Sequence, residues 1–197
     1  MNKSKRSQPK AVILDFDRTI ADLKVNWTFV RSEMTNFCSK NGVKADFVRL
    51  NPIYEVAKTV SKSKFFYDDL IAIVKKEELK SSEKADLMPG AKDFLEFLYV
   101  NGIPFAILSN NSSQCIAKIF KRFKLPSPKI IIGSDNVRYL KPHSEGLNKI
   151  LKTMKINNTE CLLVGDSDTE LHLGKVAGVK TFIVGTKNFD QLKNVLI

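Results

Sequence analysis

The sequence lacks the features that mark membrane, disulfide-bonded and zinc-finger proteins. None of its apolar runs approaches the roughly 18 residues that a membrane-spanning helix needs, and no secretory apolar segment follows residues 1–10. Its three cysteines, Cys38, Cys115 and Cys161, are widely spaced and form no Cys-x-x-Cys pair. This spacing excludes a disulfide framework and a cysteine zinc site. We therefore expect a soluble, cytoplasmic protein whose cysteines are reduced.

Internal repeats, low-complexity segments and coiled-coil heptads are also absent, so nothing in the sequence indicates an oligomeric state. What is present is an ordinary globular composition of 197 residues, 43% of them hydrophobic. A chain of this size can bury one full core and hold a small accessory domain.

Basic residues outnumber acidic ones by 32 to 21, which gives a net charge of +11. Part of the excess forms a basic tail over residues 1–10, and a second cluster lies over residues 118–129. No aromatic residues lie among the tail charges, and no nucleic-acid-binding motif accompanies either cluster. The pattern favours a solvated tail and a solvated helix face over a nucleic-acid site.

Short apolar runs alternate with amphipathic stretches over most of the chain. Residues 11–14, 103–108, 129–132, 161–164 and 181–184 have the composition of buried strands. Apolar residues at three- and four-residue spacing predict helices over residues 90–100, 112–123, 144–154 and 169–177. This alternation predicts an α/β, Rossmann-like core with a parallel five-stranded sheet flanked by helices.

Residues 22–88 break the alternation, because they show helical periodicity with little strand signal. We predict a small all-helical domain of three or four helices at this position. The expected organisation is a basic tail over residues 1–10, a core of residues 11–21 and 89–197, and a helical insertion over residues 22–88.

Polar residues of chemically useful types follow the predicted strands. They are Asp15, Asp17 and Thr19 after the first strand, Ser109 and Asn110 after the second, Lys141 ahead of the third core helix, and Asp166 and Glu170 after the fourth. Ligands of open parallel sheets bind at the carboxyl ends of the strands, so these groups should converge on one anion. Asp15 and Asp17, at positions i and i+2 of an extended segment, would point into one site and call for a cation.

The order and spacing of these residues resemble the haloacid dehalogenase superfamily, a large group of aspartate-nucleophile phosphatases. Its four motifs are matched by Asp15-Phe-Asp-Arg-Thr19, by Ser109, by Lys141, and by the acidic segment from Gly165 to Glu170. The resemblance covers the chain after the tail and is closest to phosphoglycolate phosphatases that carry a helical cap between the first two motifs. It implies a Mg²⁺-dependent phosphatase.

The resemblance also implies a role for each motif residue. Asp15 would attack phosphorus and form an aspartyl-phosphate, and Mg²⁺ would be held by Asp15, by the Asp17 backbone carbonyl and by Asp166. Asp17 would act as general acid and base, and a second aspartate at that position argues against a dehalogenase.

The remaining motif residues would surround the phosphoryl group. Thr19, Ser109 and Asn110 would bind it, Lys141 would neutralise its charge, and Glu170 would support Lys141 or the water shell of the metal. Asp168, by contrast, has the position of a helix-capping residue. His143 and His172 are given no role, because the mechanism already has its acid and its base.

Arg18 departs from the family pattern, which most often has glycine there. It could contact the substrate, pair with an acid of the helical insertion, or point outward, and the sequence does not separate these possibilities. An insertion acting as a cap would favour small substrates. Asn26, Trp27 and Arg31 are candidate contacts at its start, although packing in the cap interior is favoured for Trp27.

Several functions remain open at this point. A phosphomutase would use the same aspartyl-phosphate, a phosphonate-cleaving enzyme would need a Schiff-base lysine in the cap, and a non-catalytic module could bind an anion or nucleic acid. The predicted partner is a small phosphorylated metabolite. Phosphoglycolate, sugar phosphates, nucleotides and phosphorylated amino acids all fit.

Overall fold

The computed structural model describes residues 8–47, 53–185 and 188–196, and the chain divides into two compact units. One unit consists of Met1–Leu23 and Ala85–Ile197, and the other of Lys24–Lys84. Most of the basic tail predicted over residues 1–10 lies outside the described residues. Its last member, Lys10, forms a 2.5 Å ion pair with Glu160 on the larger unit.

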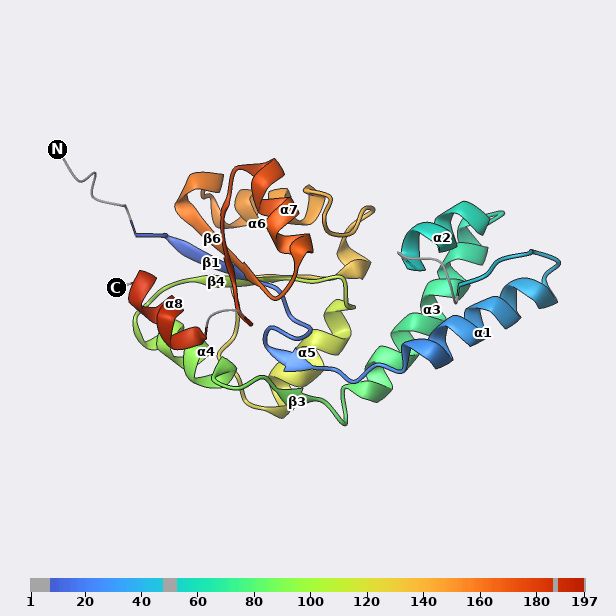
Figure 1. Ribbon diagram of the computed structural model, residues 1–197, viewed down its shortest axis with the longest axis horizontal. Helices are drawn as coiled ribbons and strands as arrows, with labels where there is room; N and C mark the ends of the chain where they lie inside the picture. Colours follow the sequence, from blue (N-terminus) through green and yellow to red (C-terminus); the bar gives the residue numbers. More distant parts are fainter. Residues whose placement is uncertain (1–7, 48–52, 186–187, 197) are drawn as a thin grey trace. The chain divides into compact units, whose positions relative to one another are not determined.

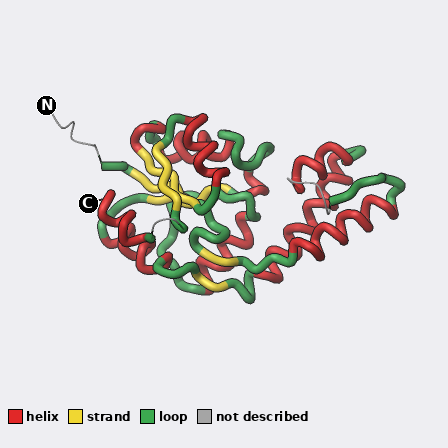
Figure 2. Tube along the Cα trace, in the orientation of Figure 1, coloured by secondary structure: helices red, strands yellow, loops and turns green. Residues whose placement is uncertain are grey.

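The larger unit is built on a five-stranded parallel sheet, which confirms the predicted fold class (Figures 1 and 2). The strands are β1 (Ala11–Leu14), β4 (Phe105–Leu108), β5 (Ile131–Ile132), β6 (Cys161–Gly165) and β7 (Lys180–Ile183). Their spatial order is β5-β4-β1-β6-β7, so β1 lies in the centre with β4 and β6 beside it. The chain adds β4 and β5 on one side of β1 and then crosses to add β6 and β7 on the other side. Open α/β sheets bind ligands at the carboxyl end of the strand where the order reverses in this way.

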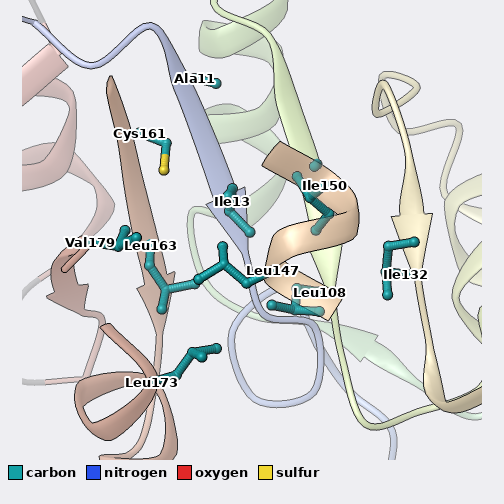
Figure 3. Close-up of a cluster of buried hydrophobic side chains, with 11 residues drawn as sticks. Ala11, Ile13, Leu108, Ile132, Leu147, Ile150, Cys161, Leu163, Leu173 and Val179 are labelled. Carbon is teal, nitrogen blue, oxygen red and sulfur yellow. The ribbon is translucent and has the colours of Figure 1, made fainter. Parts of the chain in front are cut away.

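Helices cover both faces of the sheet, with α6 (Glu145–Met154) and α7 (Asp168–Ala177) on one face (Figures 1 and 2). The other face carries α4 (Ala91–Val100), α5 (Ser113–Arg122) and α8 (Phe189–Leu196). Figure 3 shows Ile13 and Leu163 from the sheet meeting Leu147 of α6 and Leu173 of α7 in one buried cluster. These contacts hold the strand ends, and hence the polar residues after them, in fixed positions.

The sequence analysis did not predict two strands and one α-helix of this unit. Two short strands, β2 (Ala21–Asp22) and β3 (Asp86–Leu87), pair antiparallel where the chain leaves and re-enters the unit. A run of two residues carries no readable period, so no pattern could predict them. Helix α8 was also missed; it is only eight residues long and begins where the Asn188 side chain accepts a hydrogen bond from the Gln191 N–H.

The smaller unit is helical over its described residues. It contains α1 (Trp27–Lys40), α2 (Ile53–Val60) and α3 (Lys64–Ser81). Side chains from α1 and α3 are buried at helical spacing, including Val30, Met34, Leu70 and Val74. Within the part of the chain that the structure describes, no helix combines the length and apolar character needed to cross a membrane.

Candidate active site

A buried lysine joins two carboxylates at the carboxyl end of the sheet. Lys141 Nζ lies 2.5 Å from Asp15 Oδ1 and 2.5 Å from Glu170 Oε1, although Asp15 and Lys141 are 126 residues apart in the sequence. The side chains of Lys141, Asp15 and Glu170 are only 4%, 10% and 1% exposed. Lys141 is the shared counter-charge of both carboxylates, so its removal would leave two buried carboxylates uncompensated.

The three groups set one another's charge state. Burial raises the pKa of Asp15 to about 6, and the neighbouring Glu170 carboxylate adds to the rise while the Lys141 charge opposes it. Burial also acts against ionisation of Lys141 and Glu170, but attraction to Asp15 and Glu170 outweighs it for the lysine, and attraction to Lys141 outweighs it for Glu170. The pKa of Lys141 is therefore raised and that of Glu170 lowered. Lys141 is a permanent cation, whereas Asp15 gains its charge only near neutral pH.

Asp15, Asp166 and Glu170 bring carboxylate oxygens within 4.8 Å of one another, a grouping that could hold a metal ion. Both oxygens of Glu170 already have donors, however, since Oε1 accepts from Lys141 and Oε2 accepts from the Ser167 hydroxyl at 2.7 Å. Asp15 and Asp166 are thus the better-placed metal ligands, and an all-oxygen donor set suits a hard divalent cation. Burial raises the pKa of Asp166, with the Glu170 charge adding to it, as expected of a carboxylate that lacks a full counter-charge.

Asp17 lies outside that carboxylate group. Its Oδ1 accepts a 3.1 Å hydrogen bond from the Leu23 N–H, which fixes the side chain after the tight turn that follows β1. Burial raises the pKa of Asp17, and the Asp22 and Asp166 charges contribute in the same direction. A carboxylate with a raised pKa can carry a proton more readily than an ordinary aspartate, which suits an acid-base group.

The Asn110 side chain forms two hydrogen bonds with the backbone of Lys141 and so fixes the loop that carries it. Its side-chain carbonyl accepts from the Lys141 N–H at 2.9 Å, and its side-chain amide donates to the Lys141 carbonyl at 3.2 Å. Nearby, the Ser109 hydroxyl donates to Asn111 Oδ1 at 2.9 Å and accepts from the Asn111 N–H at 3.2 Å. Asn111 also follows the second predicted strand, but no individual role was predicted for it. Its presence next to two predicted site residues was the available signal.

Gly165 also matters to the site, for a steric reason. A Cβ atom at this position would lie 2.3 Å from Glu170 Cγ, so only glycine leaves room for the Glu170 side chain to pass toward Lys141.

The turn between Asp17 and Ile20 holds two further predicted residues. Arg18 has φ 61°, in the left-handed region that favours glycine, which accounts for the glycine common at this position in related motifs. Its Nε lies 3.8 Å from Asp166 Oδ2, and its side chain is 76% exposed. The pairing that the structure shows is therefore with a core carboxylate. Thr19 Oγ1 is buried and, among the described residues, has no hydrogen-bond partner.

Other residues considered from sequence have local structural contacts. The predicted capping role of Asp168 is wrong, because Ser167 caps α7; Asp168 lies in the first turn, where its negative charge suits the helix N-terminus. Asn26 caps α1 by accepting from the Phe29 N–H, and Arg31 donates to the Phe47 carbonyl at 2.5 Å. Trp27, the first residue of α1, is half-buried.

Comparison with known proteins agrees with this geometry. Residues 12–184 match the family model described as haloacid dehalogenase-like hydrolase. The chain belongs to this family of hydrolases. The resemblance noted from the four motifs is thereby confirmed.

Individual relatives match this haloacid dehalogenase-like hydrolase at modest sequence identity. A phosphoglycolate phosphatase from Pseudomonas fluorescens is 32% identical over 101 residues, which are 51% of this chain and 37% of that protein. The pyrophosphatase PpaX from Halalkalibacterium halodurans is 25% identical over 179 residues, covering 88% of this chain and 82% of its own. The chain thus spans little more than a third of the phosphoglycolate phosphatase that it matches.

Solved structures share the fold at lower identity. A subfamily IA hydrolase of the superfamily from Geobacter sulfurreducens superposes with a TM-score of 0.64 at 20% identity, covering 96% of this chain and 97% of its own. CbbY from Rhodobacter sphaeroides, solved in complex with phosphate, gives a TM-score of 0.64 at 17% identity, with coverages of 92% and 90%.

Proposed function

We propose that this hydrolase is a Mg²⁺-dependent phosphatase that cleaves a small phosphate monoester through an aspartyl-phosphate on Asp15. The observation that carries the proposal is the buried contact of Lys141 with Asp15, beside Asp166. A carboxylate repels a phosphate dianion unless fixed positive charge lies next to it, and Lys141 supplies such a charge. A Mg²⁺ ion on Asp15, Asp166 and the Asp17 carbonyl would add Lewis-acid screening of the phosphoryl oxygens.

The proposed reaction has two halves. An Asp15 oxygen attacks phosphorus and the ester P–O bond breaks, while Asp17 gives its proton to the departing alcohol oxygen. Asp17, now ionised, then takes a proton from the water that attacks the aspartyl-phosphate, which releases inorganic phosphate and regenerates Asp15. The raised pKa of Asp17 supports the first half, because the group must begin protonated.

Four further groups would hold the transferring phosphoryl. They are the Thr19 hydroxyl, the Ser109 hydroxyl, the Asn110 backbone amide and the Lys141 ammonium. The unpartnered hydroxyl of Thr19 supports its assignment, since a buried polar atom without a partner is costly unless a ligand satisfies it. Arg18 is proposed as a substrate contact.

The names of two relatives support a small phosphorylated metabolite as the substrate. The names of the matched proteins specify phosphoglycolate and pyrophosphate as what those proteins hydrolyse. We propose a phosphorylated metabolite of similar size here, with the helical insertion serving as the cap. The three cysteines are free and buried, which supports a reducing, cytoplasmic location.

A screen for released inorganic phosphate over a panel of phosphorylated metabolites tests this function. Mg²⁺-dependent release from a generic aryl phosphate and from at least one metabolite is the expected result. A phosphomutase would instead convert a sugar phosphate to its isomer without releasing phosphate, and borohydride trapping with a phosphonate substrate would reveal a Schiff-base enzyme.

Replacing Asp17 by asparagine should separate the two halves of the reaction. The introduced amide cannot take a proton from water, so breakdown of the aspartyl-phosphate is expected to slow by about 10²-fold. With an aryl phosphate, whose leaving group departs without needing a proton, phosphoenzyme formation should be retained, so phosphoenzyme should accumulate and be visible as an added phosphoryl mass after acid quenching. Wild-type turnover in this variant would contradict the acid-base assignment.

Metal dependence should change with pH. Asp15 is protonated below its pKa of about 6 and ionised above it, so protons compete with the cation as the pH falls through that value. Well below that pKa, one competing proton weakens metal affinity about tenfold per pH unit. Because the ionised fraction of Asp15 falls from about a half at about pH 6 to about a tenth at about pH 5, the Mg²⁺ concentration giving half-maximal activity is expected to rise about fivefold over that range. A constant value over that range would mean that Asp15 does not hold the ion.

A further inference from the structure

The position of the Lys141 backbone decides what its ammonium can reach. The ammonium lies 2.5 Å from Asp15 and 2.5 Å from Glu170, and the lysine side chain is 4% exposed. A lysine side chain is long and flexible, so its ion pairs alone do not fix the Cα atom from which it extends. The residues that hold the backbone of Lys141 therefore bear on the charge beside the reacting phosphoryl.

Asn110 holds this backbone from the loop between β4 and α5. Its side chain accepts from the Lys141 N–H at 2.9 Å and donates to the Lys141 carbonyl at 3.2 Å. Hydrogen bonds to both polar groups of one residue restrain its rotation as well as its position. The Asn110 side chain thus has a task separate from the phosphoryl contact proposed for the backbone amide of the same residue.

Glu145, in the first turn of α6, holds the segment just before Lys141. Its Oε2 accepts from the N–H groups of Arg138 at 3.0 Å and Tyr139 at 2.9 Å, and its Oε1 lies 2.8 Å from Lys149 Nζ. The hydrogen bond from Lys149, followed by those from the two backbone N–H groups, lowers the pKa of Glu145 to about 2. Glu145 is therefore ionised near neutral pH, and its hydrogen bonds are charge-assisted.

Together these contacts fix one short segment at two points. Glu145 fixes residues 138 and 139 from the helix that follows, and Asn110 fixes residue 141 from the neighbouring loop. Glu145 belongs to none of the four motifs, and no role was predicted for it from sequence. Misplacing a catalytic group by about 1 Å can lower a rate by about 10²-fold, so such restraint has a direct bearing on catalysis.

We propose that the Asn110 side chain and Glu145 are positioning residues, which together place the Lys141 ammonium against Asp15 and Glu170. The inference rests on the proposed phosphatase function and deepens it. It adds to the site a residue of α6 that neither touches the substrate nor belongs to a motif, and that acts only through the backbone ahead of Lys141.

Asp135 provides a matched control. Its carboxylate accepts from the Ser113 N–H at 2.8 Å and from the Ser113 hydroxyl at 2.7 Å, so it too joins the segment after β5 to the start of α5 by two hydrogen bonds. Asp135→Ala removes that connection but leaves both hydrogen bonds at the Lys141 backbone in place. It therefore reports what a general loosening of the two segments does.

Turnover of an aryl phosphate at saturating Mg²⁺ gives the first test. We expect kcat to fall at least about tenfold in Asn110→Ala and in Glu145→Ala, with KM changed less than about twofold, because the charge of Lys141 matters most in the transition state. Asp135→Ala should keep a kcat within about twofold of the wild-type value. Equal losses of kcat in Asp135→Ala and Asn110→Ala would overturn the proposal, since loosening of the loops would explain both.

Glu145→Gln separates the hydrogen bonds of Glu145 from its charge. The amide keeps one acceptor oxygen for the N–H groups of Arg138 and Tyr139 but carries no charge. We expect it to restore most of the kcat that Glu145→Ala loses. A loss in Glu145→Gln equal to that in Glu145→Ala would contradict the role of these hydrogen bonds. The Glu145 pair also tests the proposal should Asn110→Ala fail to fold.

A double variant asks whether Asn110 acts through Lys141. In a Lys141→Met background there is no ammonium to place, so adding Asn110→Ala should lower kcat by less than about twofold. A further loss of about tenfold in that background would show that the Asn110 side chain acts by another route, and would overturn the proposal.

Chemical modification of Lys141 gives a readout that does not depend on hydrolysis. The buried, doubly paired amine should resist reductive methylation in the wild-type protein, and the exposed amine of Lys121 serves as the reference in the same peptide digest. We expect Asn110→Ala and Glu145→Ala to raise the methylation rate of Lys141 relative to Lys121 at least about fivefold, and Asp135→Ala to leave it unchanged.

The two readouts keep this inference apart from the proposed function. Unchanged protection of Lys141 in Asn110→Ala and Glu145→Ala would overturn the positioning role even in an active phosphatase. Lost protection in both variants, with no phosphate released by the wild-type protein from any substrate, would support the placement of Lys141 by these residues and refute only the proposed reaction.

Discussion

Asp15→Asn is expected to remove phosphatase activity almost completely. The substitution keeps the shape of the side chain but removes the charged oxygen that would attack phosphorus, and loss of a nucleophile typically lowers turnover by at least about 10⁴-fold. Lys141 would retain its contact with Glu170, so the lysine stays paired. The measurement is steady-state release of phosphate from an aryl phosphate at saturating Mg²⁺, with a mass spectrum to show that no phosphoenzyme forms.

Asp168→Asn is the matched control for this variant. Asp168 is an exposed aspartate in the first turn of α7, two residues after the proposed ligand Asp166 and outside the buried cluster. We expect it to turn over at the wild-type rate. Retained turnover in Asp15→Asn would disprove the nucleophile assignment, whatever the control does.

Lys141→Met should reduce both activity and stability. Methionine nearly matches the length of the lysine chain but leaves Asp15 and Glu170 without their shared cation, and breaking a buried charge pair costs about 3–5 kcal/mol. Turnover should fall about 10³-fold, because the fixed positive charge beside the transferring phosphoryl is lost. Urea unfolding in the presence of a chelator would measure the stability change without a metal ion replacing the lost charge.

A double variant separates the two effects. Lys141→Met combined with Glu170→Gln removes one of the two uncompensated carboxylates, so part of the lost stability should return while activity stays low. Full stability in the single variant would mean that the contacts of Lys141 with the carboxylates contribute nothing to folding. Unimpaired turnover would mean that another cation performs its role.

The core strands and helices could be predicted because the apolar residues of each follow a simple pattern, either a continuous run or a helical spacing. Residues 11–14 form an uninterrupted apolar run and become β1, with all four residues buried. The predicted helix over residues 144–154 differs from α6 by one residue at its start. The strand predicted from residue 103 begins at Phe105 instead; Pro104, which has no N–H to donate to a neighbouring strand, precedes it.

The sequence predicted which residues form the site better than it predicted the contacts between them. Asp15, Lys141 and Glu170 could be named because each follows a strand or precedes a helix in a recognisable order. The hydrogen bonds of Asn110 with the Lys141 backbone could not be predicted, because they depend on how two loops that are 31 residues apart meet. The left-handed backbone of Arg18 was equally hidden, because arginine gives no sign of such a conformation.

The short antiparallel pair of β2 and β3 has a consequence for how this protein could have diversified. Ala21 is paired with Leu87 and Asp22 with Asp86, so the chain leaves the larger unit and returns to it at adjacent positions. Because the two ends of the insertion are already held side by side, a longer or shorter insertion does not change how the sheet closes around it. A change in the length or sequence of residues 24–84 therefore need not move the catalytic turn, because the β2–β3 pair holds both ends of the insertion in place.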